Sequence, residues 1–150
     1  MRLDRHGLGV ELPQGWDGRI YRRAVRGART HAIVHAANFP LPADRGDYGS
    51  GAVEEMGPRH VLVALIEHDR AAAGAGLFKR QGLPVPLAPT DFSRHMLQRT
   101  LPGQSGLQRF FTWEGRAFCL YVVLGSHAAR ARLVPVVNAL LASATVATLA

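Results

Sequence analysis

The chain of 150 residues is long enough for one domain with a continuous hydrophobic core. Its composition, 47% hydrophobic and 19% charged, excludes a disordered chain and is typical of a folded globular protein. The formal net charge is +7, and every basic residue except Lys79 and the histidines is an arginine. This charge favours anionic partners, although the codon usage of a GC-rich genome explains the arginine excess equally well.

The first half of the chain predicts short strands joined by turns. Residues 60–68 form the clearest central strand, because Val61, Val63 and Leu65 alternate with apolar residues of the opposite face. Residues 39–51, rich in Pro, Gly and Asp, are predicted as a loop, and residues 52–56 as one helical turn. The predicted strands of this half are 9–12, 19–25, 31–37 and 60–68.

The second half begins with a long irregular stretch, residues 69–106, which contains four prolines. Within it we expect a short helix over residues 91–99, with Thr90 as its N-cap. The strands 108–113 and 116–124 then form a hairpin, because Gly115 in the turn Glu114-Gly115 tolerates a positive φ.

The last segment predicts an amphipathic helix that begins after Ser126, its expected N-cap. Pro135 fits the first helical turn, and a kink is the alternative. The expected buried face is Leu133, Val136, Val137, Leu140 and Leu141.

These elements predict an α+β fold in a single domain, residues 1–150. We expect one antiparallel sheet of about six strands, flanked by helices, with the amphipathic helix at the C-terminus. Residues 133–150 are uncharged, but Pro135 and several polar residues favour a core helix over the alternative of a membrane tail. No apolar run follows the charged N-terminus, and Cys119 is the only cysteine, expected to be buried. A cytoplasmic location is therefore predicted.

The segment Gly9-Val10-Glu11-Leu12-Pro13-Gln14-Gly15-Trp16 resembles the opening strand-Pro-x-Gly-Trp signature of the PsbP-like family. That family includes an extrinsic subunit of photosystem II and a Ran-binding nuclear import cofactor. The aromatic hairpin and the helix ending in Val137-Asn138-Ala139-Leu140-Leu141 are similar too, so the resemblance covers about half of the chain. It implies an α/β/α sandwich and a binding or accessory role without catalysis.

Residues 47–54 and 101–106 also resemble small uncharacterised proteins of high-GC bacteria. Those proteins have no assigned activity, so the resemblance transfers no catalytic residue to this chain.

The first functional hypothesis is an accessory protein that binds another protein of unknown identity. We expect the contact surface in residues 40–51, with residues 84–99 beside it. In this hypothesis Tyr48, Phe92 and Met96 are apolar anchors, while Asp47, Arg94 and Arg99 set the orientation of the partner. The alternative, in which the apolar side chains are buried under the loops, stays open.

The second hypothesis is binding of nucleic acid or another polyanion through Arg19, Arg22, Arg23 and Arg26, with Tyr21 among them. Strand alternation places Arg19 and Arg23 on one face and Arg22 and Arg26 on the other. We favour the simpler interpretation, an edge strand whose charges prevent pairing with other sheets.

The third hypothesis is an enzyme in which Asp91 forms an acid–base pair with either His95 or His60. A helix would place Asp91 and His95 on one face, as it would an ordinary ion pair. The histidines at positions 31, 35, 60 and 68 lack the spacing of a recognised zinc site. We therefore predict neither a metal nor a cofactor, and no catalytic residue in the favoured hypothesis.

Overall fold

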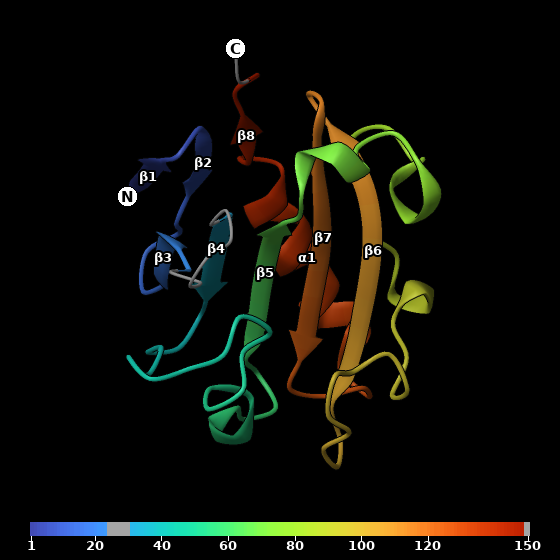
Figure 1. The fold of residues 1–150 in the computed structure, drawn as a ribbon. Coiled ribbons are helices and arrows are strands. Elements are labelled where there is room, and N and C mark those ends of the chain that lie inside the picture. The colour runs from blue at the N-terminus through green and yellow to red at the C-terminus, as the bar shows by residue number, and fades with distance from the viewer. Residues whose placement is uncertain (24–30, 149–150) are drawn as a thin grey trace.

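A five-stranded antiparallel sheet forms the centre of the molecule, and its strands lie in the order β3-β4-β5-β7-β6 (Figure 1). The computed structural model describes residues 1–23 and 31–148. The strands of this sheet are β3 (Asp17–Arg22), β4 (Ala32–Ala37), β5 (Val61–Glu67), β6 (Ser105–Trp113) and β7 (Arg116–Leu124).

A second sheet of three strands has the order β1-β2-β8. It consists of β1 (Arg2–Arg5), β2 (Leu8–Glu11) and β8 (Thr145–Val146), which brings the two ends of the chain together. The prediction of an α+β fold is confirmed, but the prediction of a single six-stranded sheet is wrong. The strand expected at residues 9–12 pairs with β1 and β8 instead of extending the large sheet.

The predicted hairpin at residues 108–124 is confirmed. Glu114 and Gly115 both have positive φ, 52° and 74°, as a two-residue turn with the right twist requires. The register pairs Trp113 with Arg116 at the turn and Ser105 with Leu124 at the far end. Strand β6 is therefore longer than the predicted strand, residues 108–113. All nine residues of β7 are buried, because β5 and β6 pair with its two edges and a core cluster covers each of its faces.

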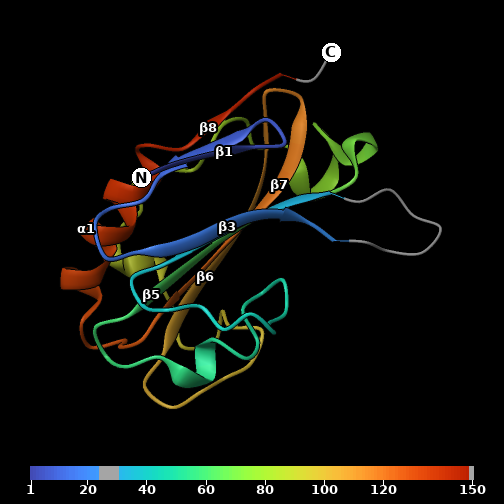
Figure 2. The same cartoon turned by 90° about the vertical axis from the view of Figure 1, so that its left-hand side faces the viewer.

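Both faces of the large sheet are covered, but by different kinds of structure. Residues of β5 alternate as predicted: Val61, Val63 and Leu65 pack into a cluster with the helix α1 (Arg130–Leu141). Leu62, Ala64 and Ile66 pack into a second cluster, which is closed by irregular segments. Figure 2 shows α1 apart from the loops that follow β4 and precede β6. A helix therefore covers one face of the large sheet, and loops cover the other.

The buried face of α1 differs from the predicted one by a single residue. Leu133, Val134, Val137, Leu140 and Leu141 are buried, whereas Val136 is 36% exposed. The helix begins at Arg130, so Pro135 is its sixth residue and lies beyond the first turn, and Ser126 is not the N-cap. Ser126 Oγ instead accepts a hydrogen bond from Ala129 N at 3.2 Å, in the turn before the helix.

The predicted helix over residues 91–99 is wrong. A 3-10 helix at Pro89–Asp91 ends where Phe92 becomes extended, and Ser93 then forms a β-bridge with Gly106. The carboxylate of Asp91 accepts a hydrogen bond from Ala88 N at 2.8 Å, which closes this short turn; Thr90 caps nothing here. The other 3-10 helices are Val53–Glu55, which confirms the expected helical turn, Arg70–Ala72 and Gly76–Phe78.

The tail beyond α1 does not continue as a helix. The chain turns after Leu141 and adds β8 to the small sheet. Among residues 1–23 and 31–148, no helix has both the length and the apolar character that a bilayer span requires.

Arg116 connects the two sheets. Its guanidinium is 1% exposed and forms two hydrogen bonds with the carboxylate of Glu67, at 2.7 and 2.9 Å. It also donates to the carbonyl oxygens of His6, Gly7 and Ala147, at 3.2 to 3.4 Å, in the β1–β2 turn and just after β8. Burial acts to raise the pKa of Glu67, but the hydrogen bonds and charge of Arg116 outweigh it and lower that pKa.

We expect Arg116→Met to lower the free energy of unfolding by about 3–5 kcal/mol, because it leaves the Glu67 carboxylate buried without its cation. Urea denaturation measures this loss. The double variant Arg116→Met/Glu67→Met should show a smaller decrease in the free energy of unfolding than the single variant. Arg109→Ala is the control, because its pair with Asp91 is about one-third exposed and its loss should stay below about 1 kcal/mol. Equal losses for the single and double variants would contradict this account.

Candidate partner-binding surface

Asp47 is the centre of a polar cluster that joins the loop after β4 to strand β3. Tyr21 Oη donates a hydrogen bond to Asp47 Oδ1 at 2.9 Å, and Arg23 Nη1 lies 2.8 Å from Oδ2. The side chain of Asp47 is 17% exposed, whereas that of Arg23 is 65% exposed. Together with His35 and Arg45 these residues form what we call the Asp47 network. Asp47 therefore organises the loop from within, where we had predicted that it orients a partner.

His35 is the buried member of the Asp47 network, with no exposed surface. Its Nε2 lies 2.7 Å from the carbonyl oxygen of Asp47, and its Nδ1 accepts a hydrogen bond from Arg45 Nε at 2.8 Å. These partners require a proton on Nε2 and none on Nδ1, so the ring is neutral. Burial lowers the pKa of His35 to about 4, and the Arg45 charge acts in the same direction.

The loop that contains Arg45 is fixed at several further points. Arg45 Nη1 donates to the carbonyl oxygen of Pro42 at 2.7 Å, and Leu41 N donates to the carboxylate of Asp17 at 2.8 Å. Arg45 also lies 6.0 Å from the centre of the Tyr21 ring. Burial and the hydrogen bond to Asp47 raise the pKa of Tyr21, so its hydroxyl remains a donor.

A second loop, before β6, lies against the first. Gln104 Nε2 donates to the carbonyl oxygen of Val53 at 2.7 Å, and Arg99 forms an exposed ion pair with Glu54 at 3.5 Å. Tyr48 packs edge-to-face on Tyr121 of β7 at 5.2 Å. We call the side of the sheet covered by residues 39–56 and 94–104 the loop face.

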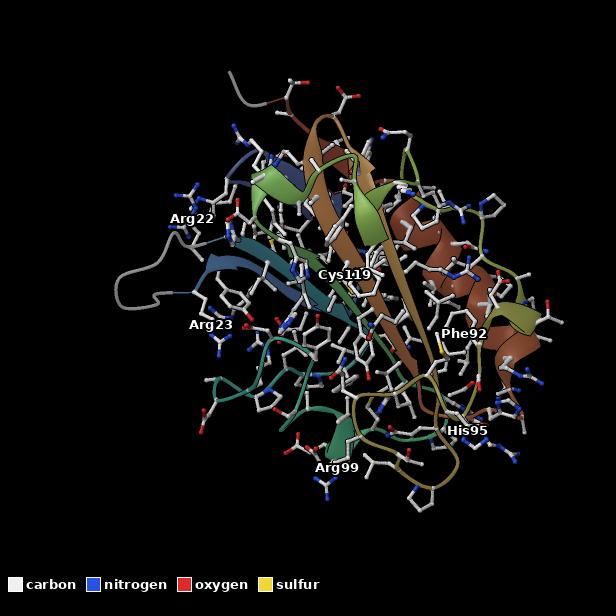
Figure 3. All side chains as sticks on the ribbon, turned by 45° about the vertical axis from the view of Figure 1, so that its right-hand side comes forward. Arg22, Arg23, Phe92, His95, Arg99 and Cys119 are labelled. Atoms are coloured by element: carbon white, nitrogen blue, oxygen red, sulfur yellow. The ribbon has the colours of Figure 1, made fainter. Side chains whose placement is uncertain are left out.

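The structure brings only some of the six predicted contact residues together. Tyr48 and Arg99 line the same small hollow of the loop face, about 50 Å³, and Asp47 lies next to Tyr48. Phe92 is 2% exposed and packs in the cluster under α1, so it is a core residue and not a surface anchor. Figure 3 shows Phe92 and Arg99 in separate places. Arg94 and Met96 are exposed.

The predicted polyanion-binding residues also have different surroundings. Arg19 and Arg22 are exposed on β3, which is an outer strand of its sheet, as the edge-strand interpretation expected. Arg23 follows the same strand but pairs with Asp47 (Figure 3). Arg26 lies outside the described residues.

The other histidines have different surroundings. His60 Nδ1 accepts a hydrogen bond from Gly57 N at 2.8 Å, and its ring stacks on Phe39. The pairing of Ile33 with Ile66 places His31 opposite His68, beside a hollow of about 220 Å³. In the described part of the chain, no group of three or more His, Cys, Asp or Glu side chains is arranged to hold a metal ion.

The proposed acid–base pair of Asp91 and His95 lacks the helix that was to align it. The carboxylate of Asp91 accepts from Ala88 N and forms an ion pair with Arg109 at 3.2 Å. His95 is exposed in the irregular segment (Figure 3). Cys119 is fully buried, as expected, and burial raises the pKa of its thiol to about 11.

Sequence reasoning missed the roles of His35 and Arg45. The available signal was a histidine within the apolar strand Ala32–Ala37. A buried imidazole needs hydrogen-bond partners, and the following loop rich in polar residues was the nearest source of them.

Comparisons of this chain with protein-family models, with curated proteins and with solved structures found no match, so the PsbP-like resemblance stays a prediction.

We expect Asp47→Ala to lower the free energy of unfolding by about 1–3 kcal/mol, because Tyr21 and Arg23 lose a charged acceptor. Asp44→Ala is the matched control, since Asp44 lies exposed in the same loop. Urea denaturation of the two variants and of the unchanged protein measures the difference. A loss for Asp47→Ala no larger than that for Asp44→Ala would show that the network does not hold the loop.

The low pKa of His35 predicts a loss of stability in acid. Its folded-state pKa, about 4, is below its ordinary value of 6.5, so the unfolded chain binds more protons between these values. The stabilising contribution is complete above about pH 6.5 and falls by about 3 kcal/mol as the pH approaches 4. Unfolding measured across this range should show a smaller pH dependence for His35→Gln, which does not titrate. An unchanged pH dependence would contradict the assignment.

Proposed function

We propose that this protein is a non-enzymatic cytoplasmic accessory protein that binds another protein through its loop face. One observation carries the proposal: two irregular loops, fixed by hydrogen bonds and an ion pair, cover one side of the sheet where a helix covers the other. Loops held on a rigid scaffold commonly carry binding residues.

The fixed loops support binding for an energetic reason. An ordered surface loses less conformational entropy on association than a flexible one, so more of the contact energy contributes to affinity. The Asp47 network orders the first loop, and Gln104 joins the second loop to it. The exposed side chains that these loops present include Ser50, Glu55, Met96, Arg99 and Thr100.

The contacts of the titratable residues favour a structural use over a catalytic one. The carboxylates of Asp47 and Asp91 each contact an arginine, and both ring nitrogens of His35 have hydrogen-bond partners. The PsbP-like resemblance implies the same accessory role.

Polyanion binding is a second candidate function, favoured by the exposure of Arg19 and Arg22 on the outer strand β3. Contacts between arginine and phosphate release counterions, so such binding weakens steeply as the salt concentration rises. Protein binding through a mixed polar surface depends on salt less steeply.

Site-specific photocrosslinking in the native cell tests the proposed surface. A photoreactive amino acid replaces Ser50 or Arg99 on the loop face, and Ala139 on the exposed side of α1 serves as the control. We expect one defined protein adduct from positions 50 and 99 and none of that size from position 139. Equal labelling from all three positions, or no protein adduct from positions 50 and 99, would contradict the proposal.

A further inference from the structure

Strands β1 and β3 are outer strands of different sheets. A groove begins between them and continues over β3 to the loop after β4. A hollow of about 300 Å³ is lined by Leu3, Asp4 and Arg5 of β1 and by residues 18–21 of β3. A second hollow of about 240 Å³ is lined by Arg19, Tyr21, Ala43 and Arg45. The two hollows share Arg19 and Tyr21, so together they form one groove over β3. Figure 2 shows the β1–β2 hairpin alongside β3.

The groove is cationic. Arg5 comes from β1, Arg19 from β3 and Arg45 from the loop after β4, so three separate elements direct positive charge to it. The carboxylate in its lining, Asp4, already pairs with Arg2 at 3.3 Å. Arg22 extends the positive charge at the end of β3: burial and then the charges of Arg22 and Arg5 lower the pKa of His6 in the neighbouring turn.

We propose that this groove binds an acidic segment of the partner protein, in which closely spaced Asp or Glu side chains contact Arg5 and Arg19. The proposal rests on the proposed function and names the chemistry of the partner. The planar guanidinium of arginine matches a carboxylate with two parallel hydrogen bonds, which gives both affinity and orientation.

The geometry goes beyond the protection of an edge strand against aggregation. Such protection requires charge only on the outer strand itself. Here Arg5 and Arg45 come from outside β3: Arg5 lines the first hollow and Arg45 the second, and Arg19 lines both. A converging set of cations around a hollow is the arrangement that a bound anion requires.

The groove favours an acidic peptide over a nucleic acid. Single-stranded nucleic acid binds through aromatic rings on which bases stack. The aromatic ring that lines the groove is Tyr21, and it already contacts His35 edge-to-face at 5.3 Å and Arg45 at 6.0 Å. Its hydroxyl donates to Asp47. The described lining therefore offers arginines for carboxylates, whereas its Tyr21 ring is already in contact with His35 and Arg45.

Fluorescence anisotropy of the full chain tests the proposal. The probe is a labelled short peptide of alternating glutamate and serine; a peptide of glutamine and serine and an oligothymidylate of equal charge are the comparisons. We expect the glutamate peptide to bind more tightly than both. Arg5→Gln/Arg19→Gln should weaken it by about tenfold or more. The control Arg80→Gln/Arg132→Gln removes the same charge from exposed positions elsewhere and should weaken it by less than about twofold.

Equal weakening in the two double variants would overturn the proposal, because net charge alone would explain the binding. Tighter binding of the oligothymidylate would overturn the proposal in favour of a nucleic acid as the ligand. Photocrosslinking separates this proposal from the proposed function. Suppose that the adducts from positions 50 and 99 persist in Arg5→Gln/Arg19→Gln, and that the glutamate peptide binds neither the unchanged protein nor this variant. The groove proposal then fails, and protein binding through the loop face stands.

Discussion

The arrangement of the two sheets depends on the buried guanidinium of Arg116. A buried cation is unfavourable unless its donors are satisfied, and here one carboxylate and three carbonyl oxygens satisfy them. Glu67 belongs to the large sheet, whereas the carbonyl oxygens belong to the β1–β2 turn and to the residue after β8. Together with the apolar contacts of Leu8 and Val10 in the core cluster, this side chain fixes the position of the small sheet. That position places β1 next to β3, and the first hollow of the cationic groove lies between these two strands.

The two faces of the large sheet are closed by different physical means. Beneath α1 the contacts are apolar, and they depend on shape and on the removal of hydrocarbon from water. On the loop face, apolar contacts are joined by buried polar groups, of which His35 is the least exposed. A buried polar network specifies one arrangement of the loop, because every alternative leaves a donor or acceptor without a partner. The same network makes the loop sensitive to acid and presents Arg45 at the groove.

Local patterns predicted the centre of the fold, and distant contacts decided the rest. The strand β5 and the β6–β7 hairpin were predictable because alternation and a two-residue turn act over a few residues. The small sheet was not, because β8 is two residues long and forms through pairing with β2, more than a hundred residues away in sequence. The helix expected at residues 91–99 failed because the backbone is extended at Phe92 and Ser93 pairs with the distant Gly106 in a β-bridge.

The candidate site was predictable to a similar extent. Polar residues in a long loop indicated the surface near Tyr48 and Arg99, but not that Asp47 forms hydrogen bonds within the protein.

The central claim is that the loop after β4 is ordered before any partner binds, and amide hydrogen exchange of the free protein tests it most directly. Gly46, Gly49 and Ala52 donate backbone hydrogen bonds of 2.9 Å within the loop, so we expect exchange far slower than in an unstructured peptide. Exchange at the unstructured rate, with β5 and β7 still protected, would contradict the account.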